Sequence, residues 1–388
     1  MDDLWQALEA ELPAARELRR ELHRHPELSG SESATRDRVL AALGQSAVPV
    51  AGTGAAVRVG DGAGPSIAVR AELDALPIDE RTGVEWASES PGVMHACGHD
   101  VHLAALVAVA RAVERAGDGL PPLLALFQPR EERYPSGARD MVGQGVLDDC
   151  AAVIGVHLHP GLEPGVVACS AGTVNASADE FTITVTGHPG HAGYPHLAQD
   201  PVVAIASIVV TLQTAVSRNV DPMTPAVLGV SSLHAGDAAN AIPGTATARG
   251  TIRAYDATAR DLLHHRLTTI ARSVADSLGC TAHVDIVRGE PVLTNDAALA
   301  AAVTTLLGTQ GFDTSADLRS MGADDFSYFA EQVPSVMLFV GATGNDMLHS
   351  PAFLPDDSDL TRVATTMLTT YLAAAQTTGA QLVISATP

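Results

Sequence analysis

Apolar residues recur along the chain at two kinds of spacing, and the mixture changes near residue 172. Before that point, short continuous apolar runs, which are typical of fully buried strands, alternate with segments of helical spacing. The apolar runs lie at 66–74, 123–127 and 152–157, and the helical segments at 3–25 and 99–116. Strands that alternate with helices indicate βαβ units and a largely parallel sheet.

The next part of the chain has the alternation of a sheet with one exposed face. Segment 180–186 alternates apolar and polar residues with a period of two. From there the predicted order is strand, helix, strand, strand, helix, strand, which is typical of a small α+β sandwich. These elements are predicted at 180–186, 201–218, 226–233, 245–255, 257–279 and 281–288.

The alternation of helices with short apolar strands returns near residue 291, with a helix at 297–308, a strand at 335–340 and a C-terminal helix. We therefore predict an α/β fold in which a largely parallel-sheet domain is interrupted by an inserted α+β two-layer sandwich. The expected boundaries are 1–174 and 287–388 for the discontinuous domain and 175–286 for the insertion. The glycine-rich segment 60–64 lacks the full dinucleotide-binding fingerprint and is predicted to be a hairpin turn.

Charge and composition argue against several partners. The 388 residues include 23 basic and 45 acidic side chains, which give a formal charge of -22. Nucleic acids and anionic lipids are bound by basic surfaces, so we expect neither as a partner. We also expect no signal peptide and no membrane span, because the sequence has no basic start followed by an apolar stretch and no run of 18 apolar residues. The four scattered cysteines fit a reducing compartment, which predicts a cytoplasmic protein.

Side chains that can bind metal follow several of the predicted strands. Ligands of open α/β sheets bind beyond the carboxyl ends of the strands. One histidine or carboxylate at such a place is usually structural, but five such places in one sheet are harder to explain in that way. The groups are Glu72 with Asp74, the segment 95–100, Glu131 with Glu132, His157, and His349.

The chemistry of these groups suits a metal-activated hydrolysis. Cys97 and His99 precede a predicted helix, whose N-terminus favours a thiolate, and thiolate, imidazole and carboxylate groups bind zinc, manganese, cobalt or nickel. Of Glu131 and Glu132, one can bind a metal while the other takes a proton from metal-bound water. Two alternatives remain open for Cys97, which could be a nucleophile or a small buried apolar residue.

Nine motifs occur along the chain in a characteristic order. They are RAELDALPIDE (70–80), MHACGHDVHLAAL (94–106), FQPREE (127–132), GVHLHP (155–160), GHPGHAGYPH (187–196), ANAIPG (239–244), GTIRAYD (250–256), MGADDFSYF (321–329) and LHSPAF (348–353). With these motifs the chain resembles the M20 metallopeptidase superfamily over nearly its whole length. More narrowly, it resembles the aminoacylase, hippurate hydrolase and auxin-conjugate amidohydrolase branch.

The resemblance implies a site with two divalent metal ions. Glu131 matches the general base of the family, and Asp74 matches the aspartate that orients a ligand histidine. The positions that match metal ligands are Cys97, His99, Glu132, His157 and His349.

The resemblance also assigns roles to the inserted domain. His191 matches the histidine that reaches the active site of a partner subunit and polarises the scissile carbonyl, so a homodimer formed through this domain is implied. Asn240 and Arg253 match positions that hold the carboxylate of the substrate. Structural roles remain open for all three, since His191 could cap a loop, Asn240 could form a turn and Arg253 could keep an edge strand soluble.

Three positions depart from the family pattern. Glu72 replaces an aspartate that is frequent in the branch, and its extra methylene could shift the edge of the metal site. Arg130 replaces a small residue and adds a cation next to the expected base. Asp324 replaces a frequent glutamate.

The implied function is metal-dependent hydrolysis of N-acyl-L-amino acids, with N-acetyl, N-benzoyl or related acyl groups, to a carboxylic acid and an amino acid. Two alternatives remain. The same two-metal site could serve a dipeptidase or carboxypeptidase, or the scaffold could belong to a non-catalytic binding protein.

Overall fold

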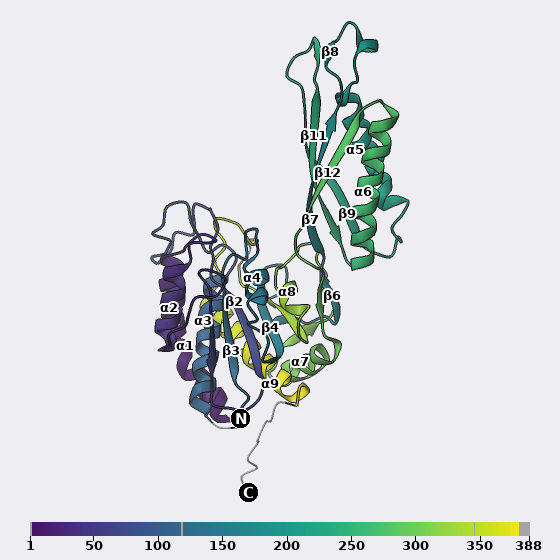
Figure 1. Cartoon of the computed structure of the whole chain (residues 1–388). Coiled ribbons are helices and arrows are strands. Elements are labelled where there is room, and N and C mark those ends of the chain that lie inside the picture. Colours follow the sequence, from purple (N-terminus) through teal and green to yellow (C-terminus); the bar gives the residue numbers. More distant parts are fainter. Residues whose placement is uncertain (1, 118, 345, 380–388) are drawn as a thin grey trace. The chain divides into compact units, whose positions relative to one another are not determined.

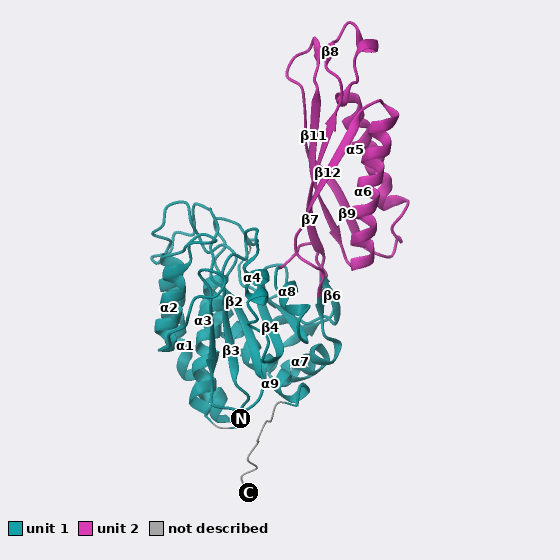
Figure 2. Cartoon of the chain, viewed as in Figure 1, with its two compact units in different colours: residues 1–174, 294–318, 325–388 teal, residues 175–293, 319–324 magenta. Residues whose placement is uncertain are grey.

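The computed structural model describes residues 2–117, 119–344 and 346–379. The chain forms two compact units (Figure 2). Unit 1 consists of Met1–Val174, Thr294–Leu318 and Asp325–Pro388, and unit 2 of Asn175–Leu293 and Arg319–Asp324. The roles expected for them, catalysis for the first and lid formation and dimerisation for the second, stay predictions.

A mixed seven-stranded sheet forms the centre of unit 1, in the order β1-β3-β2-β4-β15-β5-β14. Figure 1 shows β2, β3 and β4 side by side, and these strands are parallel to one another and to β15. The antiparallel pairs are β1 with β3 and β15 with β5. The strands are β1 (Ala55–Val59), β2 (Ser66–Glu72), β3 (Leu123–Gln128), β4 (Cys150–His159), β5 (Val166–Ala168), β14 (Asp313–Ser315) and β15 (Ser335–Gly341), with β6 (Gly172–Asn175) and β13 (Leu293–Asn295) paired separately.

The predicted hairpin turn at 60–64 is wrong. Strand β1 pairs with β3 and not with β2, so the glycine-rich segment is a connection between strands that are not neighbours. Arg58 holds this connection through the carbonyl oxygens of Gly62 and Gly64, at 3.1 and 3.2 Å. A Cβ atom on Gly62 would lie 2.4 Å from the carbonyl oxygen of Leu120, in the segment just before β3. The two backbone segments approach so closely that only glycine fits at position 62.

One apolar core joins the sheet of unit 1 to five helices. Helix α3 positions the site, because it begins immediately after the segment HACG. Gly98 precedes it with a φ of 88°, and a Cβ atom there would lie 3.0 Å from Cδ1 of Leu158. The helices of this core are α1 (Asp2–Arg24), α2 (Ser33–Leu43), α3 (His99–Ala116), α7 (Ala297–Thr309) and α9 (Asp357–Thr377), and the short helices α4 (Gly137–Gly143) and α8 (Ser327–Ala330) contact each other.

Unit 2 has the element order that the sequence predicts for an α+β sandwich. Its antiparallel sheet has the order β12-β7-β11-β9, and α5 and α6 pack on it over a separate apolar core. A two-stranded ribbon of β8 and β10 adds to it. The elements are β7 (Ser177–Thr186), β8 (Gly190–His191), the 3-10 helix η1 (Pro195–Leu197), α5 (Pro201–Ser217), β9 (Ala226–Ala235), β10 (Ala241–Ile242), β11 (Thr245–Ala254), α6 (Ala257–Ser277) and β12 (Thr281–Arg288).

None of the helices in the described part of the chain has the length and the apolar character needed to span a membrane.

A buried ionic cluster joins α1 to the start of α3. Asp100 lies 3.2 Å from Nε of Arg19 and 3.1 Å from Nδ1 of His23, and the other ring nitrogen of His23 lies 3.2 Å from Glu80. Burial alone would lower the pKa of His23, but the hydrogen bonds and charges of Asp100 and Glu80 outweigh it and raise this pKa to about 9. Protonated His23 therefore stabilises the junction of α1 and α3.

We expect this cluster to make folding stability depend on pH. Because the pKa of His23 is raised in the folded state, its contribution is fully present below its ordinary pKa of 6.5 and is lost as the pH rises through about 9. The free energy of unfolding of the wild type should therefore exceed that of His23→Gln clearly near pH 6, and by much less above pH 9. Urea titrations at both pH values measure this, and a difference that does not change with pH would contradict it.

Candidate metal centre

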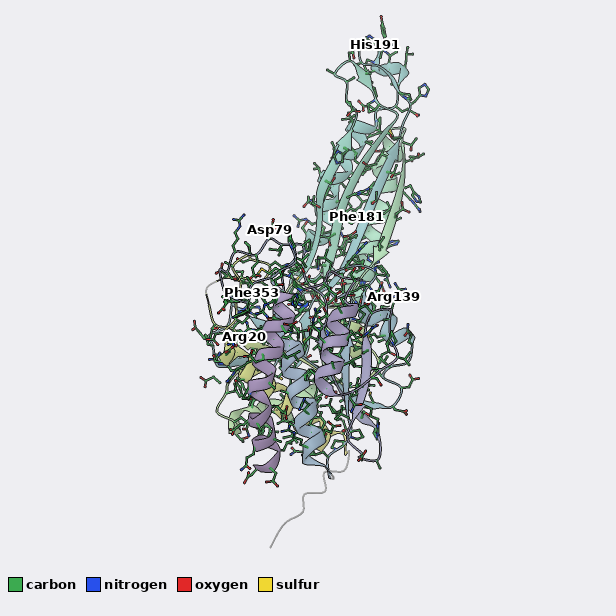
Figure 3. The ribbon with its side chains drawn as sticks, turned by 90° about the vertical axis from the view of Figure 1, so that its left-hand side faces the viewer. Arg20, Asp79, Arg139, Phe181, His191 and Phe353 are labelled. Carbon is green, nitrogen blue, oxygen red and sulfur yellow. The ribbon has the colours of Figure 1, made fainter. Side chains whose placement is uncertain are left out.

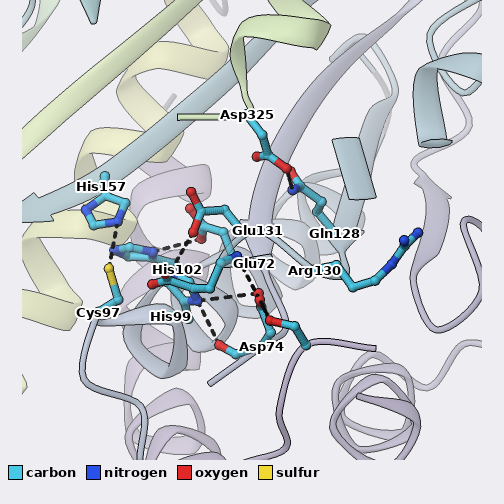
Figure 4. Close-up of polar contacts among 12 residues, drawn as sticks. Glu72, Asp74, Cys97, His99, His102, Gln128, Arg130, Glu131, His157 and Asp325 are labelled. Carbon is cyan, nitrogen blue, oxygen red and sulfur yellow. Dashed lines mark hydrogen bonds and ion pairs between the residues drawn. The ribbon is translucent and has the colours of Figure 1, made fainter. Parts of the chain in front are cut away.

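The five predicted ligands meet at the carboxyl edge of the sheet in unit 1, around the start of α3. Figure 4 shows three of them, Cys97, His99 and His157. The sequence brings them there from separate elements, because the carboxyl ends of parallel strands share one edge. Cys97 and His99 lie at the start of α3, Glu132 follows β3, His157 belongs to β4, and His349 follows β15.

One thiol is common to two groups of three donors. The ligand atoms of Cys97, His99 and His157 all lie within 4.8 Å of one another, and so do those of Cys97, Glu132 and His349. Sγ of Cys97 lies 3.5 Å from Nε2 of His157, and Nε2 of His349 lies 3.2 Å from Oε1 of Glu132. Two groups that share a donor could hold two neighbouring cations.

The ring of His99 shows that the residues fit a metal ion. Its Nδ1 lies 2.8 Å from the carbonyl oxygen of Asp74 and donates to it, which directs Nε2 to the cluster. This Nε2 is buried and has no hydrogen-bond partner among the residues that the structure describes. Since a buried polar atom without a partner is costly, and thiol, imidazole and carboxylate are ligands of zinc and its neighbours, the cluster fits a divalent transition metal.

His157 has the protonation state that a metal ligand needs. Burial lowers its pKa to about 3, so the ring is neutral near pH 7. Nδ1 lies 2.7 Å from the carbonyl oxygen of Leu158 and donates to it, which leaves the lone pair of Nε2 directed to Cys97.

The expected thiolate at Cys97 is not favoured by the protein alone. Burial raises the pKa of this thiol well above its ordinary value, and the charges of Glu132, Glu131 and Glu72 raise it further. These effects outweigh the field of the α3 N-terminus, which sequence reasoning considered alone. A bound cation would reverse the balance, because it stabilises the thiolate directly.

Asp74 connects two of the expected ligands. Its carbonyl oxygen accepts from His99, whereas its carboxylate lies 3.8 Å from the same ring nitrogen. The carboxylate instead accepts from the amide of Glu132 at 3.0 Å and from the hydroxyl of Ser29 at 2.6 Å. The aspartate thus orients the histidine through its main chain and the glutamate through its side chain.

Glu131 lies beside the ligand cluster with its carboxylate partly open. Its Oε2 is 4.0 Å from Nε2 of His99, and its side chain is 14% exposed. A carboxylate at this place can exchange protons with a molecule that lies next to the cluster.

The departure at Arg130 does not put a cation next to Glu131, so that expectation is wrong. The side chain points away from the cluster (Figure 4) and donates to Asp140 at 2.5 Å and to the carbonyl oxygen of Ala51 at 3.2 Å. The backbone turns here, since Arg130 has a φ of 52°.

Glu72 is occupied by other side chains. It pairs with Arg70 and lies 2.9 Å from Nδ1 of His102. The other nitrogen of His102 accepts from the amide of Leu158 at 3.1 Å, so both ring nitrogens of His102 are engaged.

Asp324, the third departure from the family pattern, belongs to the short segment that is part of unit 2.

The three predicted site residues of unit 2 fall into two places. His191 pairs with Ala241 in the ribbon of β8 and β10, and Ala192 donates to the carbonyl oxygen of Asn240 at 3.0 Å. Arg253 pairs with Ala178 at the opposite end of β11. Thr245 and Arg253 are eight positions apart on this strand, hence roughly 26 Å at about 3.3 Å per residue. Figure 3 shows His191 at the end of unit 2 remote from Phe181, which lies near the Arg253 end of the sheet.

Sequence reasoning missed the residues that support the site from the segment between α1 and α2. Ser29 holds Asp74, and Glu32 accepts from the amide of Arg130 at 2.9 Å. Nothing in their local sequence marks them, because their role depends on loops that are distant in the chain.

Comparison with known proteins gives a consistent result. Residues 68–373 match peptidase family M20/M25/M40. The chain is 35% identical over 353 residues to an N-acetyl-L-cysteine deacetylase of Bacillus subtilis (89% of this chain, 85% of that protein). It is 39% identical over 269 residues to an N-acyl-L-amino acid amidohydrolase of Geobacillus stearothermophilus (68% and 73%). Among solved structures, a dinuclear metal-binding peptidase of the M20 family from Bacillus subtilis superposes with a TM-score of 0.84 at 30% identity (95% and 99%).

The shared position of Cys97 predicts unequal effects of ligand substitutions. Cys97→Ala should lower the binding of every ion, because the thiol belongs to both groups of donors. His349→Ala should spare the ion held by Cys97, His99 and His157. Cobalt bound after dialysis, measured by mass spectrometry, tests this, with Cys150→Ala as the matched thiol control. Equal losses in the Cys97 and His349 variants would contradict the sharing.

Proposed function

Because the chain belongs to peptidase family M20/M25/M40, we propose that it is a metal-dependent amidohydrolase that cleaves the amide bond of N-acyl-L-amino acids. The products are a carboxylic acid, such as acetate or benzoate, and a free amino acid. The observation that carries the proposal is the pair of donor groups sharing Cys97, with the carboxylate of Glu131 beside them.

Two divalent ions, of zinc, manganese, cobalt or nickel, complete the proposed site. Cys97, His99 and His157 hold one, and Cys97, Glu132 and His349 hold the other. When bound, the ions activate water and polarise the amide carbonyl. The similar solved structure is that of a dinuclear metal-binding protein, which supports the number of ions.

Glu131 moves the protons of the reaction. Its carboxylate takes a proton from the attacking water as the new bond from oxygen to the acyl carbon forms. It then gives this proton to the amide nitrogen as the carbon–nitrogen bond breaks, and the amine leaves neutral. Cys97 acts as a ligand in this scheme and not as a nucleophile, since its sulfur is buried between the proposed metal-binding side chains.

Glu132 and Asp74 keep this arrangement in place. The pKa of Glu132 is lowered: burial alone would raise it, but the hydrogen bond with His349 and nearby positive charge outweigh burial. Glu132 is therefore an anionic ligand at neutral pH. Asp74 fixes the backbone amide of Glu132 and the ring of His99 together.

The substrate contacts of unit 2 are proposed to come from two subunits. In one copy, His191 and Asn240 lie at one end of β11 and Arg253 at the other, so one copy cannot bring all three to one small substrate. A homodimer solves this when His191 and Asn240 act in the partner's site, where His191 polarises the carbonyl and Asn240 helps hold the carboxylate. Arg253 pairs with that carboxylate from its own subunit.

Unit 2 has the exposed apolar surface that a dimer would cover. On α5 and next to it, Val203, Val210, Tyr194 and Leu197 are 52%, 72%, 59% and 68% exposed. Apolar side chains gathered on one element favour association with another protein surface. The four cysteines, all within the described residues, are free thiols, which supports a reducing, cytoplasmic location.

Replacement of Glu131 tests the function. Glu131→Gln keeps the shape but cannot accept the proton, so kcat should fall by roughly 10²- to 10⁴-fold while metal content stays unchanged. The assay uses chelator-stripped protein with added Mn, Co, Ni or Zn on N-acetyl, N-benzoyl and indoleacetyl amino acids and on simple dipeptides. Glu114→Gln, an exposed glutamate of α3, is the control.

The outcome of that assay separates the candidate functions. Unchanged turnover in Glu131→Gln would refute the mechanism. Dipeptides as the best substrates would assign the chain to the peptidases on the same site. Metal uptake without any turnover would favour a binding protein.

Mixed dimers test the place where His191 acts. Subunits carrying His191→Ala and subunits carrying Glu131→Gln should each be inactive as homodimers. Coexpressed with two different affinity tags and purified through both, the mixed dimers should give about half of the wild-type rate, because one of the two sites in each has an intact base and an intact partner histidine. No recovery in purified mixed dimers would show that His191 does not act across subunits.

A further inference from the structure

Glu32 is a fully buried carboxylate that the proposed mechanism does not use. It precedes α2 as the N-cap residue, yet its side chain makes no capping hydrogen bond. Burying a carboxylate is costly unless hydrogen bonds replace the lost water. The contacts of Glu32 therefore indicate what this side chain does.

The carboxylate of Glu32 joins three segments of unit 1. Oε1 accepts from the amide of Gly30 at 2.7 Å and from the amide of Arg130 at 2.9 Å. Oε2 accepts from the hydroxyl of Thr53 at 2.5 Å. The contact with Arg130 reaches the loop after β3, one residue before Glu131.

Glu131 thus lies between two main-chain amides that buried carboxylates hold. Glu32 accepts from the amide of Arg130, and Asp74 accepts from the amide of Glu132 at 3.0 Å. The carboxylate of Asp74 is fixed in turn by Ser29 at 2.6 Å, only three residues before Glu32. The segment from Ser29 to Glu32 therefore holds both sides of the expected base.

The backbone at Arg130 needs this support. Its φ of 52° lies in the left-handed region, which is unfavourable for a residue with a Cβ atom. Such a conformation persists only where the surroundings impose it. Gly137 donates to the carbonyl oxygen of Arg130 at 3.1 Å, and the guanidinium donates to Asp140 and to the carbonyl oxygens of Ala51 and Pro135. Glu32 holds the amide of the same residue.

We propose that Glu32 is a positioning residue, which keeps the turn at Arg130 in the conformation that directs Glu131 to the metal cluster. Its effect on the rate rests on the proposed function, whereas its hold on the loop does not. To hold the turn at Arg130, residue 32 needs a hydrogen-bond acceptor at the end of a side chain as long as that of glutamate. It does not need a negative charge, because the partners are two amides and one hydroxyl.

Three variants separate this role from a general contribution to folding. Glu32→Ala removes the acceptor. Glu32→Gln keeps an acceptor oxygen for the two amides, and its amide group can donate to Thr53. Glu11→Ala is the matched control, since Glu11 is also buried but pairs with Arg111 and Arg115 on α3, at 2.7 and 2.6 Å.

The first measurement is hydrogen exchange of the peptide that contains residues 127–136, on the intact protein. Exchange at the amide of Arg130 should be at least about tenfold faster in Glu32→Ala than in the wild type. It should be unchanged in Glu32→Gln and Glu11→Ala. Unchanged exchange in Glu32→Ala would overturn the proposal.

The second measurement is kinetic, with bound metal determined in each variant. We expect kcat of Glu32→Ala to fall about 10- to 100-fold with little change in KM and in metal content, and Glu32→Gln to recover most of the loss. A larger KM with normal kcat, or a Gln variant as impaired as the Ala variant, would overturn the positioning role.

The two measurements also separate this proposal from the proposed function. If the wild type hydrolyses no substrate of the panel, the function fails, and hydrogen exchange still decides whether Glu32 holds the loop. If Glu32→Ala does not fold, Glu32→Asp replaces it, because this variant keeps the charge but withdraws the carboxylate by one methylene. Normal exchange in Glu32→Asp would then overturn the proposal.

Discussion

Many buried polar groups surround Cys97, and each of them needs a partner. This need is the constraint on which the arrangement of the rest of unit 1 depends. Charges and polar atoms are tolerated inside a protein only when partners replace the lost water. Arg70 and His102 satisfy Glu72, and Ser29 and the amide of Glu132 donate to Oδ2 of Asp74, whose Oδ1 has no hydrogen-bond partner among the described residues. Nε2 of His99 has no hydrogen-bond partner among the described residues, and burial and nearby carboxylates raise the pKa of the Cys97 thiol, so a bound cation would stabilise both groups. The site thus fits the two divalent ions proposed for it.

The loops at the carboxyl edge take conformations that this organisation requires. Gly98 turns left-handed before α3, where a side chain would meet Leu158. Arg130 and His349 have positive φ values of 52° and 65° without being glycine. Strained backbone of this kind gathers at functional sites, because the surroundings hold it there. In this unit the hold comes from hydrogen bonds, such as that from the amide of His349 to the carbonyl oxygen of Ala96 at 2.8 Å.

Sequence patterns predicted the helices and strands whose bounds follow from the pattern of buried apolar residues within each segment. Helix α3 and strand β12 begin and end at the predicted residues, because their apolar periodicity is strong. The pairing of β1 with β3 could not be predicted, since it depends on which strands meet in space. The five candidate ligands could be named from their motifs, but the engaged nitrogens of His102, the outward direction of Arg130 and the contacts of Glu32 depend on atoms far away in the chain.

The central claim is that one buried thiol lies between two metal ions. Anomalous X-ray diffraction from crystals grown with zinc, with data collected above and below the zinc absorption edge, tests it most directly. We expect two anomalous peaks, one next to His99 and His157 and one next to Glu132 and His349, each within bonding distance of Sγ of Cys97. A single peak, or two peaks of which only one contacts Cys97, would contradict it.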